Sequence, residues 1–257
     1  FKQKTAYEIG VRLVGSEMCI RDRAATGFGF GLIAVPVLLI ALNSSSAIQV
    51  AIMLSLLIAL ILVPSLRSFV DWRLLRLFVI GSGVGIPLGV VIFLVIDLIL
   101  LKVLTGLVVI ISVLFITGRV GGRAHMLPDT PSTVRDLTVG MMAGIMNASL
   151  AIPGPLPVAR MVRLGVTPET IRATILALFV FSYPVAITLQ ALMAGVSLVT
   201  FKVTAVLIPA TLIGIVTGRI LASRITERMF IRITVVLLVS TALGLFINAG
   251  YSDLEMG

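Results

Sequence analysis

Long apolar runs alternate with short polar connections along most of the chain. Each of six runs has close to the roughly 20 helical residues that cross a hydrocarbon core of about 30 Å. The pattern therefore predicts an all-α polytopic membrane protein in which six helices each cross the bilayer once. The expected spans are residues 46–64, 77–96, 98–117, 170–193, 201–218 and 233–248.

Two further apolar stretches are interrupted where a continuous helix would be expected. The first, TGFGFGLIAVPVLLIAL at 26–42, is loosened by glycines, and the second, NASLAIPGPLPVAR at 147–160, is broken by prolines. Amides freed by a break cannot stay unpaired in lipid, so such backbone must face protein or a water-filled cavity. Paired breaks in two halves of a membrane protein indicate a transport site. The breaking residues are Gly27, Gly29, Gly31, Pro153, Gly154 and Pro155.

Short matches between the two halves indicate an internal repeat. AIQVAIM from residue 47 aligns with TIRATIL from residue 170, GIPLG from 85 with GIVTG from 214, and LFI from 114 with LFI from 245. Their common order favours duplication over chance. We expect a first membrane repeat at 24–118, a cytoplasmic linker loop at 119–133 and a second repeat at 134–250.

The placement of arginine predicts how the repeats are oriented. If the stretch at 137–157 crossed the membrane once, basic residues would divide evenly between the two sides. If it enters and leaves by the same face, all thirteen arginines after residue 23 lie on one side, which the positive-inside rule favours. Each repeat is then a broken, re-entrant helix hairpin plus three transmembrane helices. Because three is odd, the two repeats are inverted, with the arginine-rich loops cytoplasmic and the C-terminus outside.

The ends of the chain and its composition add few candidate groups. Residues 1–23 carry five basic and three acidic residues and resemble a translated, non-native adapter sequence in place of the first apolar limb; a genuine cytoplasmic tail is the alternative. Residues 251–257 form a short tail.

The net charge of +9 fits a positively charged cytoplasmic face, so no nucleic-acid partner is expected. With one cysteine, Cys19, and one histidine, His125, no metal site or cofactor is expected.

Several motifs resemble the sulfite exporter TauE/SafE family of membrane proteins. They are TGFGFGLIAVPVLLI, VDWRLL, GVGIPLGV, and GIMNASLAIPGPLPVARMVRLG followed by IRAT, and the resemblance covers residues 24–250. The family pattern is a glycine-rich break followed by a proline in each half, which Pro36 completes in the first half. The resemblance implies a multi-pass transporter of the bacterial inner membrane that moves sulfite, organosulfonates or related small anions.

The predicted site binds an anion between the two opposed helix breaks. Broken helices direct N–H groups and positive dipole ends toward the mid-plane. Thr26, Asn147 and Ser149 would add side-chain donors beside the breaks, and Gln49 either lines the path or bonds a neighbouring helix. Arg172 would attract anions near the inner mouth or serve as a cytoplasmic anchor.

We therefore expect an exporter of small sulfur oxyanions, driven by the membrane potential, and not an enzyme. No Asp or Glu is expected deep in a span, as a proton-coupled mechanism would need. A membrane-embedded enzyme and a structural subunit of a membrane complex remain as alternatives. The oligomeric state, a homodimer included, stays open.

Overall fold

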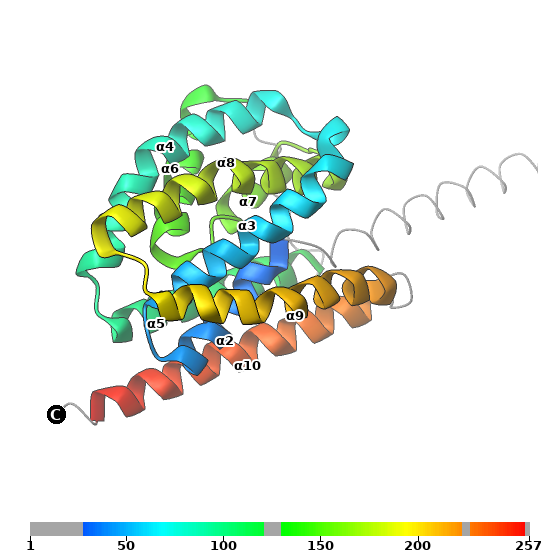
Figure 1. Ribbon diagram of the computed structural model, residues 1–257. Coiled ribbons are helices and arrows are strands. Elements are labelled where there is room, and N and C mark those ends of the chain that lie inside the picture. Colours follow the sequence, from blue (N-terminus) through cyan, green and yellow to red (C-terminus); the bar gives the residue numbers. More distant parts are fainter. Residues whose placement is uncertain (1–27, 121–129, 223–226, 255–257) are drawn as a thin grey trace, which may run out of the picture.

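A computed structural model describes residues 28–120, 130–222 and 227–254, and this part of the chain is helical without a strand (Figure 1). Residues 1–23, interpreted above as a non-native sequence, lie outside the described residues. The helices, with one short 3-10 turn η1 (Arg67–Phe69), are α2 (Phe28–Leu42), α3 (Ser46–Leu66), α4 (Trp72–Val95), α5 (Leu98–Val120), α6 (Thr133–Leu150), α7 (Pro155–Arg163), α8 (Pro168–Ala194), α9 (Leu198–Ala222) and α10 (Glu227–Leu254).

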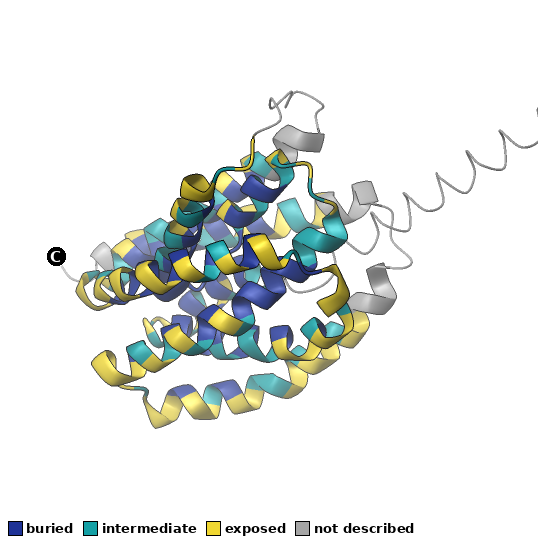
Figure 2. Ribbon diagram, turned by 90° about the horizontal axis from the view of Figure 1, so that it is seen from above, coloured by how far each residue is buried: buried dark blue, intermediate teal, exposed yellow. Residues whose placement is uncertain are grey.

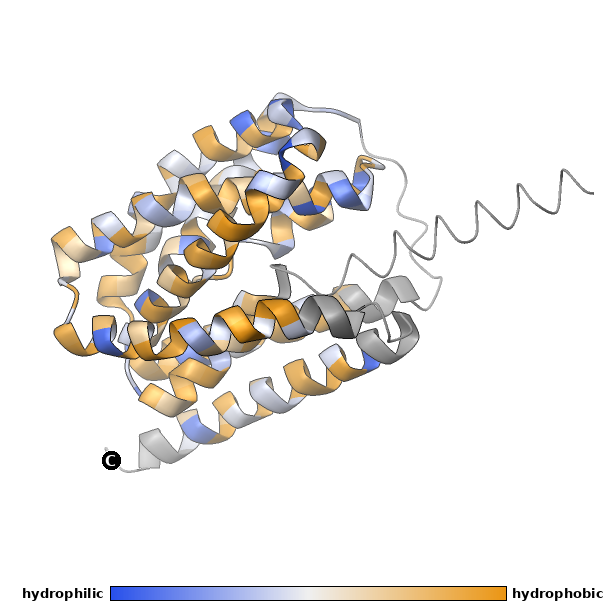
Figure 3. Ribbon diagram, turned by 45° about the vertical axis from the view of Figure 1, so that its right-hand side comes forward, coloured by the Kyte–Doolittle hydropathy of each residue, from blue (hydrophilic) through white to orange (hydrophobic). Residues whose placement is uncertain are grey.

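Six of the described helices, α3, α4, α5, α8, α9 and α10, are long and apolar enough to cross a membrane. This confirms the all-α polytopic class, and hydrophobic residues cover most of the helix surfaces in Figure 3. Helices α4, α8, α9 and α10 begin earlier than the apolar runs predicted, whereas α3 and α5 begin at the predicted residues. For example, the Asp71 carboxylate accepts hydrogen bonds from the backbone N–H groups of Arg73 and Leu74, so α4 starts at Trp72 and not at residue 77.

The first interrupted stretch differs from its prediction. From Phe28 to Leu42 the chain forms one continuous helix, α2, which contains Gly29, Gly31 and Pro36. Proline removes one backbone donor without ending this helix, and the glycines lie in its first turns. The expected break is therefore wrong for residues 28–42, and Thr26 and Gly27 lie outside the described residues.

The second stretch is a broken hairpin, as predicted. Helix α6 ends at Leu150, four non-helical residues follow, and α7 begins at Pro155. The Arg160 Nε donates to Asp136 Oδ1 at 2.7 Å, and Arg160 Nη2 donates to the Thr130 carbonyl at 3.1 Å. Because Asp136 lies in the first turn of α6 and Arg160 in the last turn of α7, the hairpin returns to the end at which it enters.

The two limbs of this hairpin differ in length. Helix α6 has 18 residues and α7 has 9, or roughly 27 and 13 Å of helix. The break also falls before most of the prolines. Pro155 and Pro157 occupy the first turn of α7, where a missing N–H costs no helical bond.

Helices α3 and α8 pack against each other at the centre of the protein, and α3 lies between α8 and α9 (Figure 1). Buried residues gather in this interior, whereas exposed residues lie on the outer helices (Figure 2). The most extensive contact joins α4 to α6, and α5 packs against α10. The inverted relation of the two halves stays a prediction.

The α4–α6 contact depends on glycine. A Cβ added to Gly81, Gly85 or Gly89 would come within 2.0–2.5 Å of a carbonyl oxygen of α6, at Leu137, Met141 and Ile145 in turn. These contacts advance together along both helices, so α4 and α6 run parallel with their backbones almost touching. The packing of small residues at four-residue spacing is a common way for membrane helices to associate closely.

Candidate functional site

The break between α6 and α7 is formed by a left-handed residue that is not glycine. Ala151 has φ 56° and ψ 26°, and its N–H donates to the Asn147 carbonyl at 2.9 Å. The Ile152 N–H donates to the Met146 carbonyl at 3.3 Å. These bonds close the end of α6, while Pro153 and Gly154 are buried and connect to α7.

The start of α7 offers few backbone donors, because prolines occupy three of its positions. Pro153, Pro155 and Pro157 have no N–H, so the remaining backbone donors at this end are those of Gly154 and Leu156. Neither donates a backbone hydrogen bond within the described residues. Both lie at the positive end of the α7 dipole, where an anion is stabilised.

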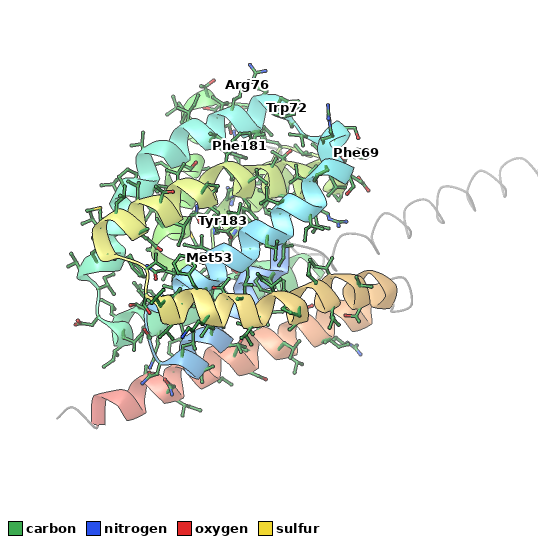
Figure 4. All side chains as sticks on the ribbon, viewed as in Figure 1. Met53, Phe69, Trp72, Arg76, Phe181 and Tyr183 are labelled. Atoms are coloured by element: carbon green, nitrogen blue, oxygen red, sulfur yellow. The ribbon has the colours of Figure 1, made fainter. Side chains whose placement is uncertain are left out.

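Three other helices meet at the break. A Cβ added to Gly31 of α2 would lie 3.1 Å from the Ala151 carbonyl oxygen, so the two predicted stretches do come together. The Tyr183 hydroxyl of α8 donates to the same oxygen over 3.4 Å. Ser55 of α3 lies beside the Tyr183 phenol without a hydrogen bond of regular geometry. Figure 4 labels Tyr183 on α8, in the middle of the helix assembly as seen in this view.

Several buried polar atoms next to the break have no hydrogen-bond partner in the described chain. Asn147 is 0% exposed, and both its amide oxygen and its amide nitrogen are unpaired. Gln190 donates to the Ala148 carbonyl at 2.7 Å, but its Oε1 is unpaired. An unpaired buried polar group costs about 1–3 kcal/mol, which calls for a compensating role. A polar ligand would supply the missing partners.

The remaining predicted residues lie farther from the break or are already bonded. The Ser149 hydroxyl donates to the Ile145 carbonyl of its own helix at 2.7 Å. The Gln49 Nε2 donates to the Gly195 carbonyl at 3.0 Å, so it joins α3 to the α8–α9 connection. Arg172 precedes Tyr183 on α8 by 11 residues, or roughly 16 Å of helix, so it does not reach the break.

Sequence reasoning missed three buried polar groups. Tyr183 is one, and its only signal was an isolated tyrosine before a proline within an apolar run. The Asp136–Arg160 pair is the second, with side chains 0% and 4% exposed. The third is Lys102 on α5, whose Nζ donates at 2.6 Å to both Asn43 Oδ1 and Asn248 Oδ1. Lys102 thereby fastens the ends of α2 and α10 to the start of α5.

The described residues contain no group of three His, Cys, Asp or Glu side chains able to hold a metal. Instead, a broken helix hairpin that packs against α4 and α8 buries neutral polar groups at its break, and six of the described helices are apolar spans. This combination defines a polytopic membrane protein of transporter type.

The chain belongs to the sulfite exporter TauE/SafE family, whose family model matches residues 23–245. This confirms the resemblance found in the motifs. No curated protein and no solved structure matches the chain.

Proposed function

We propose that the protein exports small sulfur oxyanions and binds them at the break between α6 and α7. The observation that carries the proposal is Asn147, which is fully buried with both amide atoms unpaired one helical turn before the break. Its NH₂ group and the N–H groups of Gly154 and Leu156 are donors for sulfite-type oxygens. The family description, sulfite exporter, supports the same class of substrate.

The surroundings of the break favour an anion without an amino group. The polar contacts at the break come from neutral side chains and backbone, namely Asn147, Ser55, Tyr183 and Gln190. The carboxylates whose side chains the structure describes lie at helix ends: Asp71, Asp97, Asp136 and Glu169. A substrate ammonium group would therefore be buried without a partner, which is costly. Sulfite and sulfoacetate fit this site, and the zwitterion taurine does not.

Export of such an anion needs no coupling ion. A negative cell interior contributes about 2.3 kcal/mol per charge per 100 mV toward outward movement of an anion. Asp136, in the first turn of α6, is a buried carboxylate of the hairpin, but it is paired with Arg160 at 2.7 Å. We therefore assign the driving force to the membrane potential. Flux that ignores the potential and follows a proton gradient would contradict this assignment.

Transport by the purified protein in liposomes tests the binding site. We expect Asn147→Leu to lower the efficiency of sulfite transport about 10- to 100-fold, since a hydrogen bond to a charged group contributes about 1.5–3 kcal/mol. The matched control is Thr138→Val on the same helix, where an exposed hydroxyl bonds to the Arg135 carbonyl. This control should transport normally.

The thermal midpoint of the same variants separates binding from packing. Removing an unpaired buried amide should leave the stability of Asn147→Leu unchanged or raised, because no protein hydrogen bond is lost. Lower transport in an equally stable protein supports the site. Unchanged transport in folded Asn147→Leu would instead favour a structural role for the break, and turnover of substrate without transport would favour an enzyme.

A further inference from the structure

Gln190 of α8 caps the end of α6. In a continuous helix the Ala148 carbonyl would accept a hydrogen bond from the Ile152 N–H, but that N–H donates to the Met146 carbonyl instead. The Gln190 Nε2 takes its place and donates to the Ala148 carbonyl at 2.7 Å. Because only the nitrogen of the amide can donate, this bond leaves the Gln190 Oε1 as a buried acceptor that is unpaired among the described residues.

A second buried acceptor belongs to the same turn of α6. Asn147 directly precedes Ala148, and neither atom of its side-chain amide has a partner in the described part of the chain. Whichever way this amide is turned, it presents one acceptor oxygen and one NH₂ group. The end of α6 therefore presents two amide oxygens in addition to the N–H groups of Asn147, Gly154 and Leu156.

Two free acceptors restrict the chemical form of the anion. The doubly charged sulfite ion has only lone pairs, so it would leave both amide oxygens unpaired and bring its charge against their negative ends. Hydrogensulfite in its HO–SO₂⁻ form also has one O–H group. Its hydroxyl can donate to an amide oxygen while its remaining oxygens accept from N–H groups.

The charge of the break favours the same form. The Tyr183 hydroxyl donates its proton to the Ala151 carbonyl over 3.4 Å, and the other described side chains at the break are neutral amides and a hydroxyl. The buried Arg160 lies in the last turn of α7, away from the break, and is paired with Asp136 at 2.7 Å. A second negative charge on the anion would be buried without a described cation beside it, which is costly.

We infer that Gln190 and Asn147 select the singly charged, protonated form of the substrate, hydrogensulfite, by accepting a hydrogen bond from its hydroxyl group. This inference rests on the export function proposed above. Gln190 is then a specificity-determining residue, and each exported ion carries one charge and one proton. Sulfoacetate, which has no ammonium group but two charges near neutral pH, binds more weakly than hydrogensulfite.

Competition by methanesulfinate tests the hydrogen bond. This anion, CH₃–SO₂⁻, has the single charge of hydrogensulfite and a methyl group in place of the hydroxyl. The assay is uptake of labelled sulfite into liposomes at slightly acidic pH, where hydrogensulfite predominates, with uptake by protein-free liposomes subtracted. We expect methanesulfinate to compete about 10- to 100-fold more weakly than unlabelled sulfite, since it leaves the amide oxygens unpaired. Equal competition by the two anions would overturn the inference.

The preference for sulfite over methanesulfinate also separates selection from packing. Gln190→Leu should lower this preference about fivefold or more, because one acceptor is lost, whereas a packing defect would affect both anions alike. Thr138→Val should keep the wild-type preference. An unchanged preference in Gln190→Leu would overturn the role of Gln190, and if this variant does not fold, the wild-type competition decides.

The charge moved with each ion gives an independent measurement. With equal pH on both sides, a potential of about 60 mV should hold a sulfite ratio of about tenfold across the membrane if one charge moves, and of about a hundredfold if two move. We expect the tenfold ratio, and the hundredfold ratio would overturn the inference while leaving the export function intact. Absence of any sulfite transport by the wild-type protein would instead reject the proposed function itself.

Discussion

The close contact between α4 and α6 predicts that one methyl group at Gly85 will separate the two helices. In Gly85→Ala the new Cβ would lie 2.0 Å from the Met141 carbonyl oxygen, whereas ordinary contact begins at 3.4 Å. The helices must therefore move apart by about 1.4 Å, because a backbone oxygen cannot rotate away as a flexible side chain would. Overpacking costs about 1–3 kcal/mol, and a backbone clash belongs at the upper end of this range.

The neighbouring glycine provides the control. A Cβ on Gly83 meets nothing within 4 Å, so Gly83→Ala adds only the better helix propensity of alanine, worth up to about 1 kcal/mol. Gly85→Ala gains the same propensity, so this term cancels, and we expect the free energies of unfolding of the two variants to differ by the overpacking cost alone, about 2–3 kcal/mol. Denaturant titration in detergent micelles, followed by circular dichroism, measures this difference. Equal stability of the two variants would refute the reasoning from the α4–α6 contact.

Three further predictions concern buried polar groups and the break. Arg160→Met should lower the free energy of unfolding by about 3–5 kcal/mol, because it leaves the Asp136 carboxylate buried and unpaired. Adding Asp136→Leu should recover most of this loss, and additive losses in the double-mutant cycle would contradict the prediction. Ala151→Gly should raise the thermal stability, since a left-handed alanine costs about 1–2 kcal/mol, and a lower midpoint would show that the Ala151 methyl group packs favourably. Lys102→Met should cost about 1–3 kcal/mol of unfolding free energy by leaving two amide oxygens without their donor, and an unchanged denaturation midpoint would count against that role.

Hydropathy and arginine placement were enough to predict the spans and the second hairpin. The positive-inside rule favoured a hairpin at residues 137–157, and the contact between Asp136 and Arg160 shows that the start of α6 and the end of α7 meet, while the membrane face at which they lie stays a prediction. The same reasoning placed the break among the prolines, because it had no means of foreseeing a left-handed Ala151. The same reasoning predicted an interruption at residues 28–42, where α2 is continuous. Glycine and proline are tolerated inside a membrane helix when neighbouring groups satisfy the backbone atoms that they free.

The partners of the break were harder to predict than the break itself. Helix α8 is apolar on nearly all sides, so hydropathy does not reveal which of its faces points inward. Tyr183 and Gln190 reach the break only because α8 packs against α3, α4 and α6, and that packing is decided by the shapes of all four helices. Arg172, on the same helix, was chosen for its charge as a residue near the inner mouth, and that role stays a prediction.

The parallel contact of α6 with α4 also bears on how the protein is inserted during its synthesis. Helix α6 is not among the helices that are apolar enough to cross a membrane unaided, and Asp136 lies in its first turn. Helix α6 should therefore partition poorly from the translocon into the bilayer on its own, because its hydrophobicity is too low. We therefore expect α4 to be inserted first, so that its glycine face is available in the bilayer when the α6–α7 hairpin enters. Insertion of the second half of the chain then depends on the first half.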